Sequence, residues 1–184
     1  MEAISDNALM LKVKEGDLDK LSLLFERYKK PLYGFFYGLC KDGELSEDLV
    51  QNVFYRILKY RYLFRGEGDF KTWMFHIARN VKHDDFRKDK IRIKDPLEDW
   101  EHVLSSDENK IAEIQQHEEL ALLSIALRRL PEEKREVLLL SRYQEKKYKE
   151  IGIILGCSEA TVKVKVFRAL HELRIIYKQL EKHM

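Results

Sequence analysis

Residues 148–173 have the sequence YKEIGIILGCSEATVKVKVFRALHEL, which decides the fold of the C-terminal part of the chain. Helical spacing predicts a short helix over residues 149–155, and Gly156 permits a sharp turn after it. Ser158 is a suitable N-cap for a longer, basic helix. This order predicts a helix-turn-helix, whose second helix enters the major groove of DNA. The apolar residues expected between the two helices are Ile151, Ile154, Leu155, Val162 and Val166.

The second helix of this motif has a polar face whose residue types suit DNA. Lysine and arginine bind phosphates, while threonine and valine contact the methyl group of thymine. The alternative is a helical bundle with a charged exterior, but the order of turn, cap and basic helix favours DNA binding. The candidate DNA-contacting residues are Ser158, Thr161, Lys163, Val164, Lys165, Phe167 and Arg168.

The composition predicts an all-α protein. The 184 residues are 45% hydrophobic and 36% charged, and they include only 8 glycines and 3 prolines to interrupt helices. The two cysteines, Cys40 and Cys157, are too far apart in sequence to indicate a metal site or a disulfide framework. We find no signal peptide and no run of apolar residues long enough to span a membrane, so we expect a soluble, cytoplasmic protein without membrane insertion.

Charge is distributed in three segments. Residues 1–94 have a net charge of +4, residues 95–125 have −8, and residues 126–184 have +6. Two basic segments around an acidic one indicate two surfaces for a polyanion and a connector that avoids or mimics it. The alternative is that these charges only keep helix surfaces solvated.

The N-terminal half predicts several helices with a buried aromatic core. A first helix begins near Asp6, and a second is capped by Asp17 or Asp19. Pro31 is expected to open a third segment, and Ser46 is expected to cap the helix SEDLVQNVFYRILKY. The charged loop RGEGDF, residues 65–70, precedes the helix FKTWMFHIARNVKHDDFRKDK, in which we expect Trp73 and Phe75 to be core residues rather than wedges that separate DNA strands.

Both ends of the chain resemble one protein family. The sequence LRRLPEEKREVLLLSRYQEKKYKEIGIILGCSEATVKVKVFRALHELR resembles region 4 of bacterial RNA polymerase sigma factors of the extracytoplasmic-function (ECF) subgroup of the sigma-70 family. The patterns EDLVQ and W-x-x-x-IARN resemble region 2. The resemblance implies two small helical domains, region 2 in residues 1–94 and region 4 in residues 120–184. A flexible acidic linker, residues 95–119, joins them.

The resemblance also implies a function and two sets of site residues in the N-terminal domain. Region 2 binds the clamp of the polymerase β′ subunit and captures an unstacked base of the −10 element, while region 4 binds the −35 element and the flap of the β subunit. Members of the family are often held inactive by an anti-sigma factor. The residues implied for polymerase binding are Asp48, Gln51, Asn52 and Arg56. Those implied for the −10 element are Asn80, Arg79, Lys82, Lys71, Arg65 and Arg87.

One motif departs from the family pattern. The family often has TVKSR at the start of the last helix, where this chain has TVKVK with Val164 and Lys165. Lysine lacks the bidentate fork that arginine offers guanine, so we expect a −35 sequence different from the usual one.

Other functional classes are less consistent with the motifs. The sequence contains no nucleophile–base pair, phosphate-binding loop or metal-ligand spacing, so it predicts a protein that is not an enzyme and needs no cofactor or metal. A stand-alone helix-turn-helix regulator would often be a dimer on a palindromic site. A helical adaptor would show no salt-dependent affinity for DNA. The EDLVQ and IARN motifs argue against both alternatives.

Overall fold

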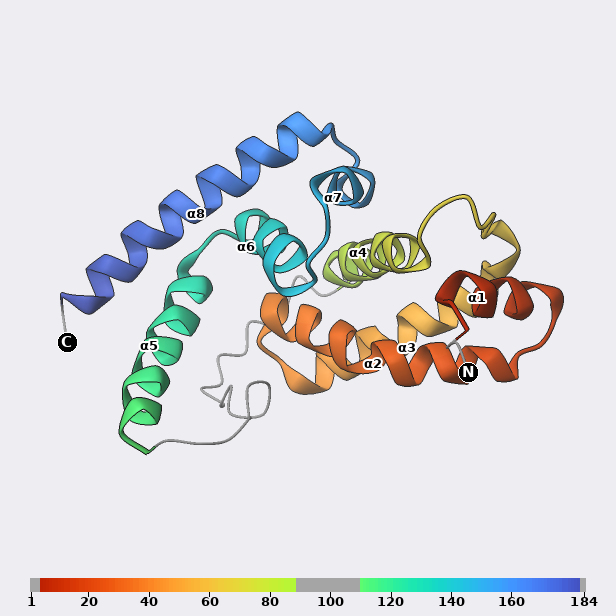
Figure 1. Ribbon diagram of the computed structural model, residues 1–184, viewed down its shortest axis with the longest axis horizontal. Coiled ribbons are helices and arrows are strands. Elements are labelled where there is room, and N and C mark those ends of the chain that lie inside the picture. The colour runs from red at the N-terminus through yellow and green to blue at the C-terminus, as the bar shows by residue number, and fades with distance from the viewer. Residues whose placement is uncertain (1–3, 89–109, 183–184) are drawn as a thin grey trace.

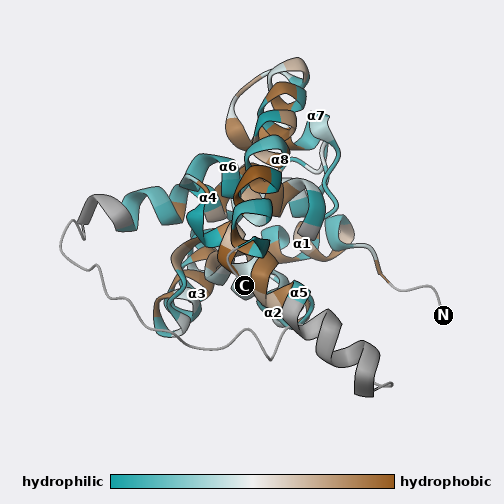
Figure 2. Ribbon diagram, turned by 90° about the vertical axis from the view of Figure 1, so that its left-hand side faces the viewer, coloured by the Kyte–Doolittle hydropathy of each residue, from teal (hydrophilic) through white to brown (hydrophobic). Residues whose placement is uncertain are grey.

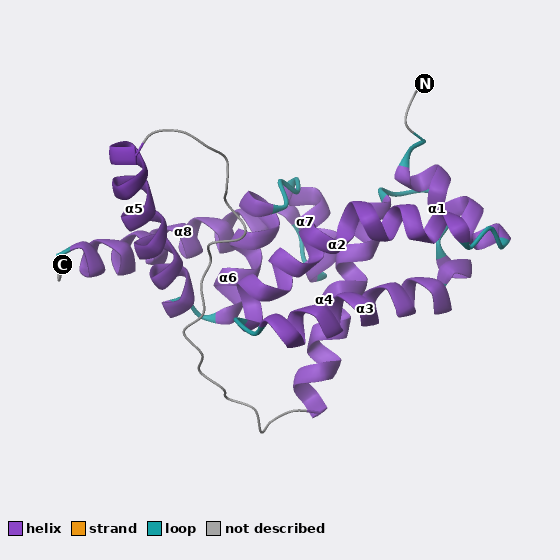
Figure 3. Cartoon of the chain, turned by 90° about the horizontal axis from the view of Figure 1, so that it is seen from below, coloured by secondary structure: helices purple, strands orange, loops and turns teal. Residues whose placement is uncertain are grey.

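The computed structural model describes residues 4–88 and 110–182, and every regular element in these residues is a helix (Figure 3). The all-α prediction is therefore confirmed for the described residues. Residues 95–109 of the expected linker lie outside them. Residues 110–119, which we also assigned to the linker, form the first half of a helix instead.

The N-terminal half forms a layered group of helices (Figure 1). Aromatic side chains, among them Phe35, Phe36 and Phe75, are buried in its core. The long second helix packs against the first and third helices, and the third packs against the fourth. The elements are α1 (Asp6–Glu15), α2 (Asp19–Cys40), α3 (Gly43–Lys59), a single 3-10 turn (Arg61–Leu63) and α4 (Phe70–Lys88).

Three predicted helix starts in this half are wrong. The N-cap of α2 is Leu18 rather than Asp17 or Asp19, and no side chain caps this end. Pro31 does not open a helix but lies inside α2, because packing of the helix outweighs the loss of one backbone donor. Ser46 is buried inside α3, where its hydroxyl donates to the backbone oxygen of Asp42. The cap is Asp42, whose carboxylate accepts from the backbone N–H of Leu45 at 3.0 Å.

The C-terminal half is built on two long helices that pack on each other and two short ones that pack on the second long helix. In Figure 1 the long helices run along the left of the molecule, and the short ones lie against the N-terminal half. The elements are α5 (Lys110–Arg129), α6 (Glu132–Leu138), a π turn (Leu139–Tyr143), α7 (Tyr148–Leu155) and α8 (Glu159–Glu181).

One hydrophobic core joins the two halves of the chain. Buried residues of α2, α4, α6 and α8 belong to the same cluster, and Figure 2 shows hydrophobic segments gathered toward the middle of the molecule. Gly38 of α2 lies so close to Leu139 that a Cβ atom on the glycine would be 2.8 Å from Cδ1 of the leucine. The two halves therefore pack in direct contact, which the sequence did not predict.

Hydrogen bonds to backbone oxygens of α2 strengthen this contact. The guanidinium group of Arg135 donates to the backbone oxygen of Leu39 at 3.0 Å, near the C-terminus of α2. The side-chain amide of Gln144 donates to the backbone oxygen of Pro31 at 3.1 Å. Both donors come from the C-terminal half. The Arg135 bond satisfies a carbonyl in the last turn of α2, where carbonyls lack intrahelical donors.

Candidate nucleic-acid and partner surfaces

The helix-turn-helix forms as the sequence predicts. Gly156 ends α7 with a φ of 69°, in the left-handed region that favours glycine. The hydroxyl of Ser158 accepts from the backbone N–H of Thr161 at 3.2 Å, so the predicted N-cap is confirmed. Ile151, Ile154, Val162 and Val166 are buried between the helices, and Leu155 is half-buried.

Gly152 fixes the approach of α7 to this turn. A Cβ atom at this position would lie 2.7 Å from the backbone oxygen of Cys157, which cannot move aside as a side chain can. A glycine inside an apolar helix is the sequence signal of such close packing. Gly152 therefore belongs with Gly156 and Ser158 among the residues that shape the motif.

The outer face of α8 is exposed along its first two turns. Thr161, Lys163 and Arg168 contribute polar groups to it. Val164 and Phe167 lie one turn apart and are 47% and 71% exposed, so a small apolar patch interrupts the basic face. A face of this kind can bind phosphates with its cations and thymine methyl groups with its apolar side chains.

Three of the predicted residues on α8 have partners within the protein. The hydroxyl groups of Ser158 and Thr161 are 2.8 Å apart in the cap. Lys163 lies 3.4 Å from the exposed carboxylate of Glu159. Lys165 is half-buried, with its ammonium group 3.8 Å from Glu133 of α6.

The polar residues predicted to bind polymerase lie along α3. Asp48 and Gln51 are exposed one turn apart. Asn52 and Arg56 are half-buried and bonded to each other, with Nε of the arginine 3.3 Å from Oδ1 of the asparagine. Arg56 also forms an ion pair of 2.8 Å with Asp84 of α4. Asp48 and Gln51 are thus the more accessible pair, while Arg56 connects two helices.

The residues predicted to bind the −10 element differ in accessibility. Asn80 on α4 and Arg65 in the 65–70 loop are exposed. Arg87 lies in α4, but its side chain is outside the described residues. Phe75 is fully buried, as expected, and Trp73 is half-buried against Phe64, with their ring centroids 5.2 Å apart.

The other three basic residues of this set face the C-terminal half. Lys71 donates to the backbone oxygen of Gln144 at 3.1 Å, and partial burial is the main cause that lowers the pKa of its ammonium group. Nε of Arg79 lies 3.4 Å from Oε1 of the buried Glu136. Lys82 pairs with the carboxylate of Glu132. The groups that Lys71, Arg79 and Lys82 contact therefore all belong to residues 132–144.

Lys82, which the sequence predicts as a phosphate contact, is covered in this arrangement. Its side chain is 1% exposed, and its ammonium group forms an ion pair with Glu132 at the start of α6. The helical spacing placed Lys82 on the polar side of α4, which is correct. That side is covered because α6 of the other half packs on it.

A buried ammonium group holds the halves together near the 65–70 loop. Nζ of Lys146 lies 2.6 Å from Oδ2 of Asp69, 3.0 Å from Oγ1 of Thr72 and 3.0 Å from Oε1 of Glu150. Burial acts to raise the pKa of both carboxyl groups, but hydrogen bonds and the positive charge of Lys146 outweigh it, so both pKa values are lowered. Nothing in the sequence distinguishes Lys146 from exposed lysines beside it.

Neither a membrane-spanning helix nor a metal site is present in the described residues. No helix among them is long and apolar enough to cross a membrane. No group of three or more histidine, cysteine or acidic side chains in residues 4–88 and 110–182 has the arrangement of a metal site.

Comparison with known proteins decides the family. The family description "Sigma-70 region 2" matches residues 24–91, and "Sigma-70, region 4" matches residues 121–173. The ECF RNA polymerase sigma factor SigX of Bacillus subtilis (strain 168) is 32% identical over 161 residues, which cover 85% of this chain and 82% of SigX. The chain belongs to the ECF sigma factors. SigM of the same organism is also 32% identical to this sigma factor, over 84% of this chain and 93% of SigM.

Solved structures show the same fold as this sigma factor. CnrH, solved in complex with the cytosolic domain of CnrY, gives a TM-score of 0.72 at 21% identity and covers 95% of this chain and 97% of CnrH. The sigma factor RpoE of Bartonella quintana, solved with the anti-sigma factor NepR, gives a TM-score of 0.68 at 24% identity. That match covers 85% of this chain and 96% of RpoE.

The family assigns the function of this sigma factor. It binds core RNA polymerase and directs initiation at specific promoters by recognising −35 and −10 elements and assisting promoter opening. Sigma factors are initiation factors without catalytic activity of their own. A stand-alone regulator would need only the helix-turn-helix, so the region 2 match in the same chain argues against that alternative.

Proposed function

We propose that residues 1–94 act as region 2, which binds the polymerase clamp and the −10 element, and that residues 120–184 act as region 4, which binds the −35 element. Residues 95–119 act as the linker. The family matches at residues 24–91 and 121–173 fall inside the two domains and support this division. We place this sigma factor in the cytoplasm, where the polymerase and the chromosome lie.

The exposed face of α8 is the observation that carries the −35 proposal. Thr161 and Val164 contact base edges, and Phe167 packs on thymine methyl groups or sugars beside them. Lys163, Lys165 and Arg168 contact phosphates or guanine. Ser158 holds the N-terminus of α8 in place and directs its first backbone N–H groups toward a phosphate.

Asp48 and Gln51 are the proposed contacts with the β′ clamp. Both are exposed on α3 and lie away from its buried face. Asn52 and Arg56 extend this surface toward α4. Since Arg56 already pairs with Asp84, its contribution is to keep the α3 surface in a fixed orientation as well as to meet the partner.

Asn80 and Arg65 are the proposed −10 contacts that are accessible in this structure. An amide donates to and accepts from a base edge, which suits Asn80 to an unstacked base. Lys71, Arg79 and Lys82 bind the DNA backbone only after the two halves separate, because their partners here are groups of region 4. Promoter binding therefore requires opening of the interface between α4 and the C-terminal half, which includes α6 and α7. Arg87 is a further proposed phosphate contact on α4.

We also propose that an anti-sigma factor binds this chain. The two similar structures were solved with partner proteins, and the partner of the Bartonella protein is named an anti-sigma factor. A partner that stabilises the packed arrangement would keep Lys71, Arg79 and Lys82 away from DNA. It would act by shifting a population between packed and open forms.

In vitro transcription tests the proposal. Purified core polymerase is given pooled genomic fragments, with and without the protein, and the new RNA starts are mapped. We expect discrete starts, preceded by shared −10 and −35 sequences. Asp48→Ala should weaken core binding at least tenfold, while Glu44→Ala, exposed in the same helix, should not. Absence of new starts, with duplex DNA still bound, would contradict the proposal.

A further inference from the structure

We propose that α1 is a brace that holds the 65–70 loop in the shape needed to capture a base of the −10 element. The inference rests on the proposed −10 role of this loop. It concerns residues that lie outside the region 2 match, which begins at residue 24. Asn7, Leu11 and Lys14 of α1 form the brace, and each contacts a different part of the loop or its flanks.

Asn7 connects α1 to the end of the loop through both ends of its amide. Nδ2 donates to the backbone oxygen of Gly68 at 2.8 Å, and Oδ1 accepts from the backbone N–H of Phe70 at 2.8 Å. The two bonds span more than 60 residues of sequence. They fix both the direction of the amide and the backbone between Gly68 and Phe70, since a flipped amide would satisfy neither partner.

Lys14 and Leu11 hold the beginning and the middle of the loop. Nζ of Lys14 donates to the backbone oxygen of Phe64 at 2.8 Å. The two Cδ atoms of Leu11 lie 3.5 Å from the position of a Cβ atom on Gly66, which has a φ of 76°. Residues 7, 11 and 14 are spaced at i, i+4 and i+7, so one face of α1 runs along the whole loop.

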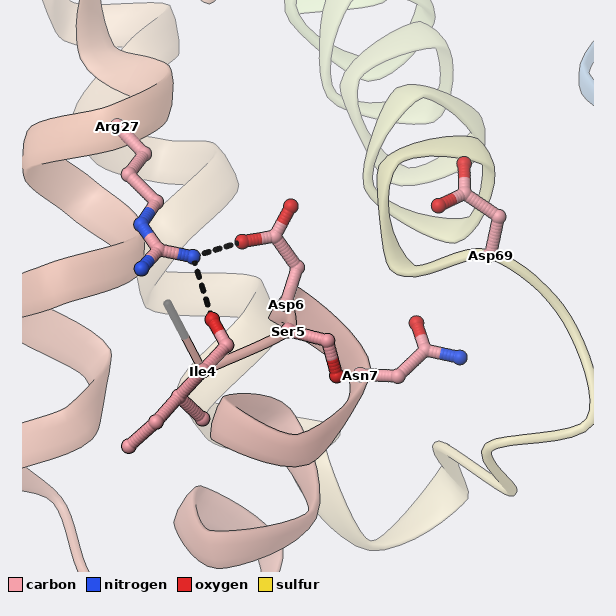
Figure 4. Close-up of a pocket in the computed structure, with 6 residues that line it drawn as sticks. All are labelled: Ile4, Ser5, Asp6, Asn7, Arg27 and Asp69. Carbon is pink, nitrogen blue, oxygen red and sulfur yellow. Dashed lines mark hydrogen bonds and ion pairs between the residues drawn. The ribbon is translucent and has the colours of Figure 1, made fainter. Parts of the chain in front are cut away.

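The brace is itself anchored to the body of the domain. Leu9, Met10 and Val13 are fully buried on the other face of α1. The carboxylate of Asp6 pairs with Nη1 of Arg27 on α2 at 2.6 Å, as Figure 4 shows, and also accepts from the hydroxyl of Tyr28. Figure 4 shows Asn7 and Asp69 on either side of an open pocket between α1 and the loop.

This arrangement explains how a loop with two glycines can bind a base. Gly66 and Gly68 give the free loop high conformational entropy, which ordering on DNA would have to overcome. The backbone contacts from α1 order the loop beforehand, while the side chains of Arg65, Glu67 and Asp69 remain exposed. Pre-ordering of this kind increases affinity without any new contact with the ligand.

The test measures promoter opening by holoenzyme assembled from core polymerase and the full chain. Permanganate reactivity of thymines in the −10 region reports unpaired bases. Asn7→Ala should reduce the open fraction or its rate of formation about tenfold, from the loss of two hydrogen bonds. Asn7→Asp, which keeps only the acceptor for Phe70, should give an intermediate loss. Lys12→Ala, exposed elsewhere on α1, is the matched control and should have no effect.

Two further readouts separate positioning from loss of structure. In a positioning variant, core binding should be unchanged within error, and the thermal unfolding midpoint should fall by only about 2–4 °C, so that the protein stays folded during the assay. Lys14→Met tests the other end of the loop by the same assay, and it should also reduce opening. If Asn7→Ala lowers core binding as much as opening, or if neither Asn7→Ala nor Lys14→Met affects opening, the brace is excluded.

Asn80→Ala and Arg65→Ala distinguish failure of the brace from failure of the proposed function. If either of them lowers opening while Asn7→Ala and Lys14→Met do not, region 2 acts on the −10 element and the brace alone is wrong. If none of the four lowers opening, the proposed −10 role of this surface is wrong, and the inference falls with it.

Discussion

The ammonium group of Lys146 lies 2.6 Å from the carboxylate of Asp69, although 77 positions separate the two residues in sequence. Lys146 belongs to the segment before the helix-turn-helix, and Asp69 belongs to the loop proposed to capture a promoter base. The ion pair therefore connects the promoter-facing parts of both regions. If the loop captures a promoter base as proposed, DNA would compete with this ion pair for the loop.

Removing this cation should weaken the packed arrangement. Lys146→Met keeps the aliphatic stem but leaves Asp69 and Glu150 without their shared partner, so we expect the free energy of unfolding to fall by about 2 kcal/mol. Urea denaturation of Lys146→Met, Asp69→Asn and the double variant should give a coupling of about 1 kcal/mol. Lys163→Met, in the exposed pair with Glu159, is the control and should change stability by less than about 0.5 kcal/mol. No coupling would mean that the pair does not hold the halves together.

The ion pairs of Lys146 with Asp69 and Glu150 predict how the free energy of unfolding depends on pH. The pKa values of Asp69 and Glu150 are lowered in the folded state, so their contribution is present above the unfolded pKa values, near 4, and is lost as the pH falls through the lowered folded values. We expect the wild-type protein to lose stability below about pH 4 more steeply than Lys146→Met. Urea denaturation over a pH series measures this difference. Parallel curves for the two proteins would show that Lys146 does not lower these pKa values.

A methyl group at Gly152 should disturb the helix-turn-helix. Gly152→Ala would place a Cβ atom against the backbone oxygen of Cys157, so we expect a loss of about 2 kcal/mol in the free energy of unfolding. Gly38→Ala is the matched comparison. Its Cβ would meet only the flexible end of Leu139, and alanine favours the helix, so the net loss should be under about 1 kcal/mol. Thermal and urea unfolding check both, and equal losses would contradict the backbone explanation.

Arg168 should contribute to −35 binding through its charge. In holoenzyme binding to a −35 fragment from a mapped promoter, Arg168→Ala should weaken binding by about 1–3 kcal/mol if the guanidinium contacts guanine. If it contacts a phosphate, the slope of affinity against salt should fall by about one unit. Lys178→Ala, exposed further along α8, should change neither. Equal effects of the two substitutions would indicate a general charge effect rather than a defined contact.

The local patterns were sufficient for the elements whose stability is local. Gly156 and Ser158 are a C-terminal stop and an N-cap whatever surrounds them, and the apolar spacing of residues 151–166 leaves one way to bury both helices. The errors at Pro31 and Ser46 arose where packing of a long helix overrode a local signal. A proline inside α2 is tolerated because α1, α3 and the C-terminal half hold the helix on several sides.

The sequence by itself determined that the chain is helical, that it ends in a helix-turn-helix, and that it belongs with the ECF sigma factors. These follow from periodicity, caps and motifs within short segments. Only the tertiary structure decided that Lys82 is buried against Glu132 and that Lys146 pairs with Asp69. It also decided that the amide of Asn7 forms a hydrogen bond with the backbone of the 65–70 loop. Each of these joins residues at least 50 positions apart. Helical spacing assigns a side chain to a face, but the partner that covers that face is set by how the helices pack.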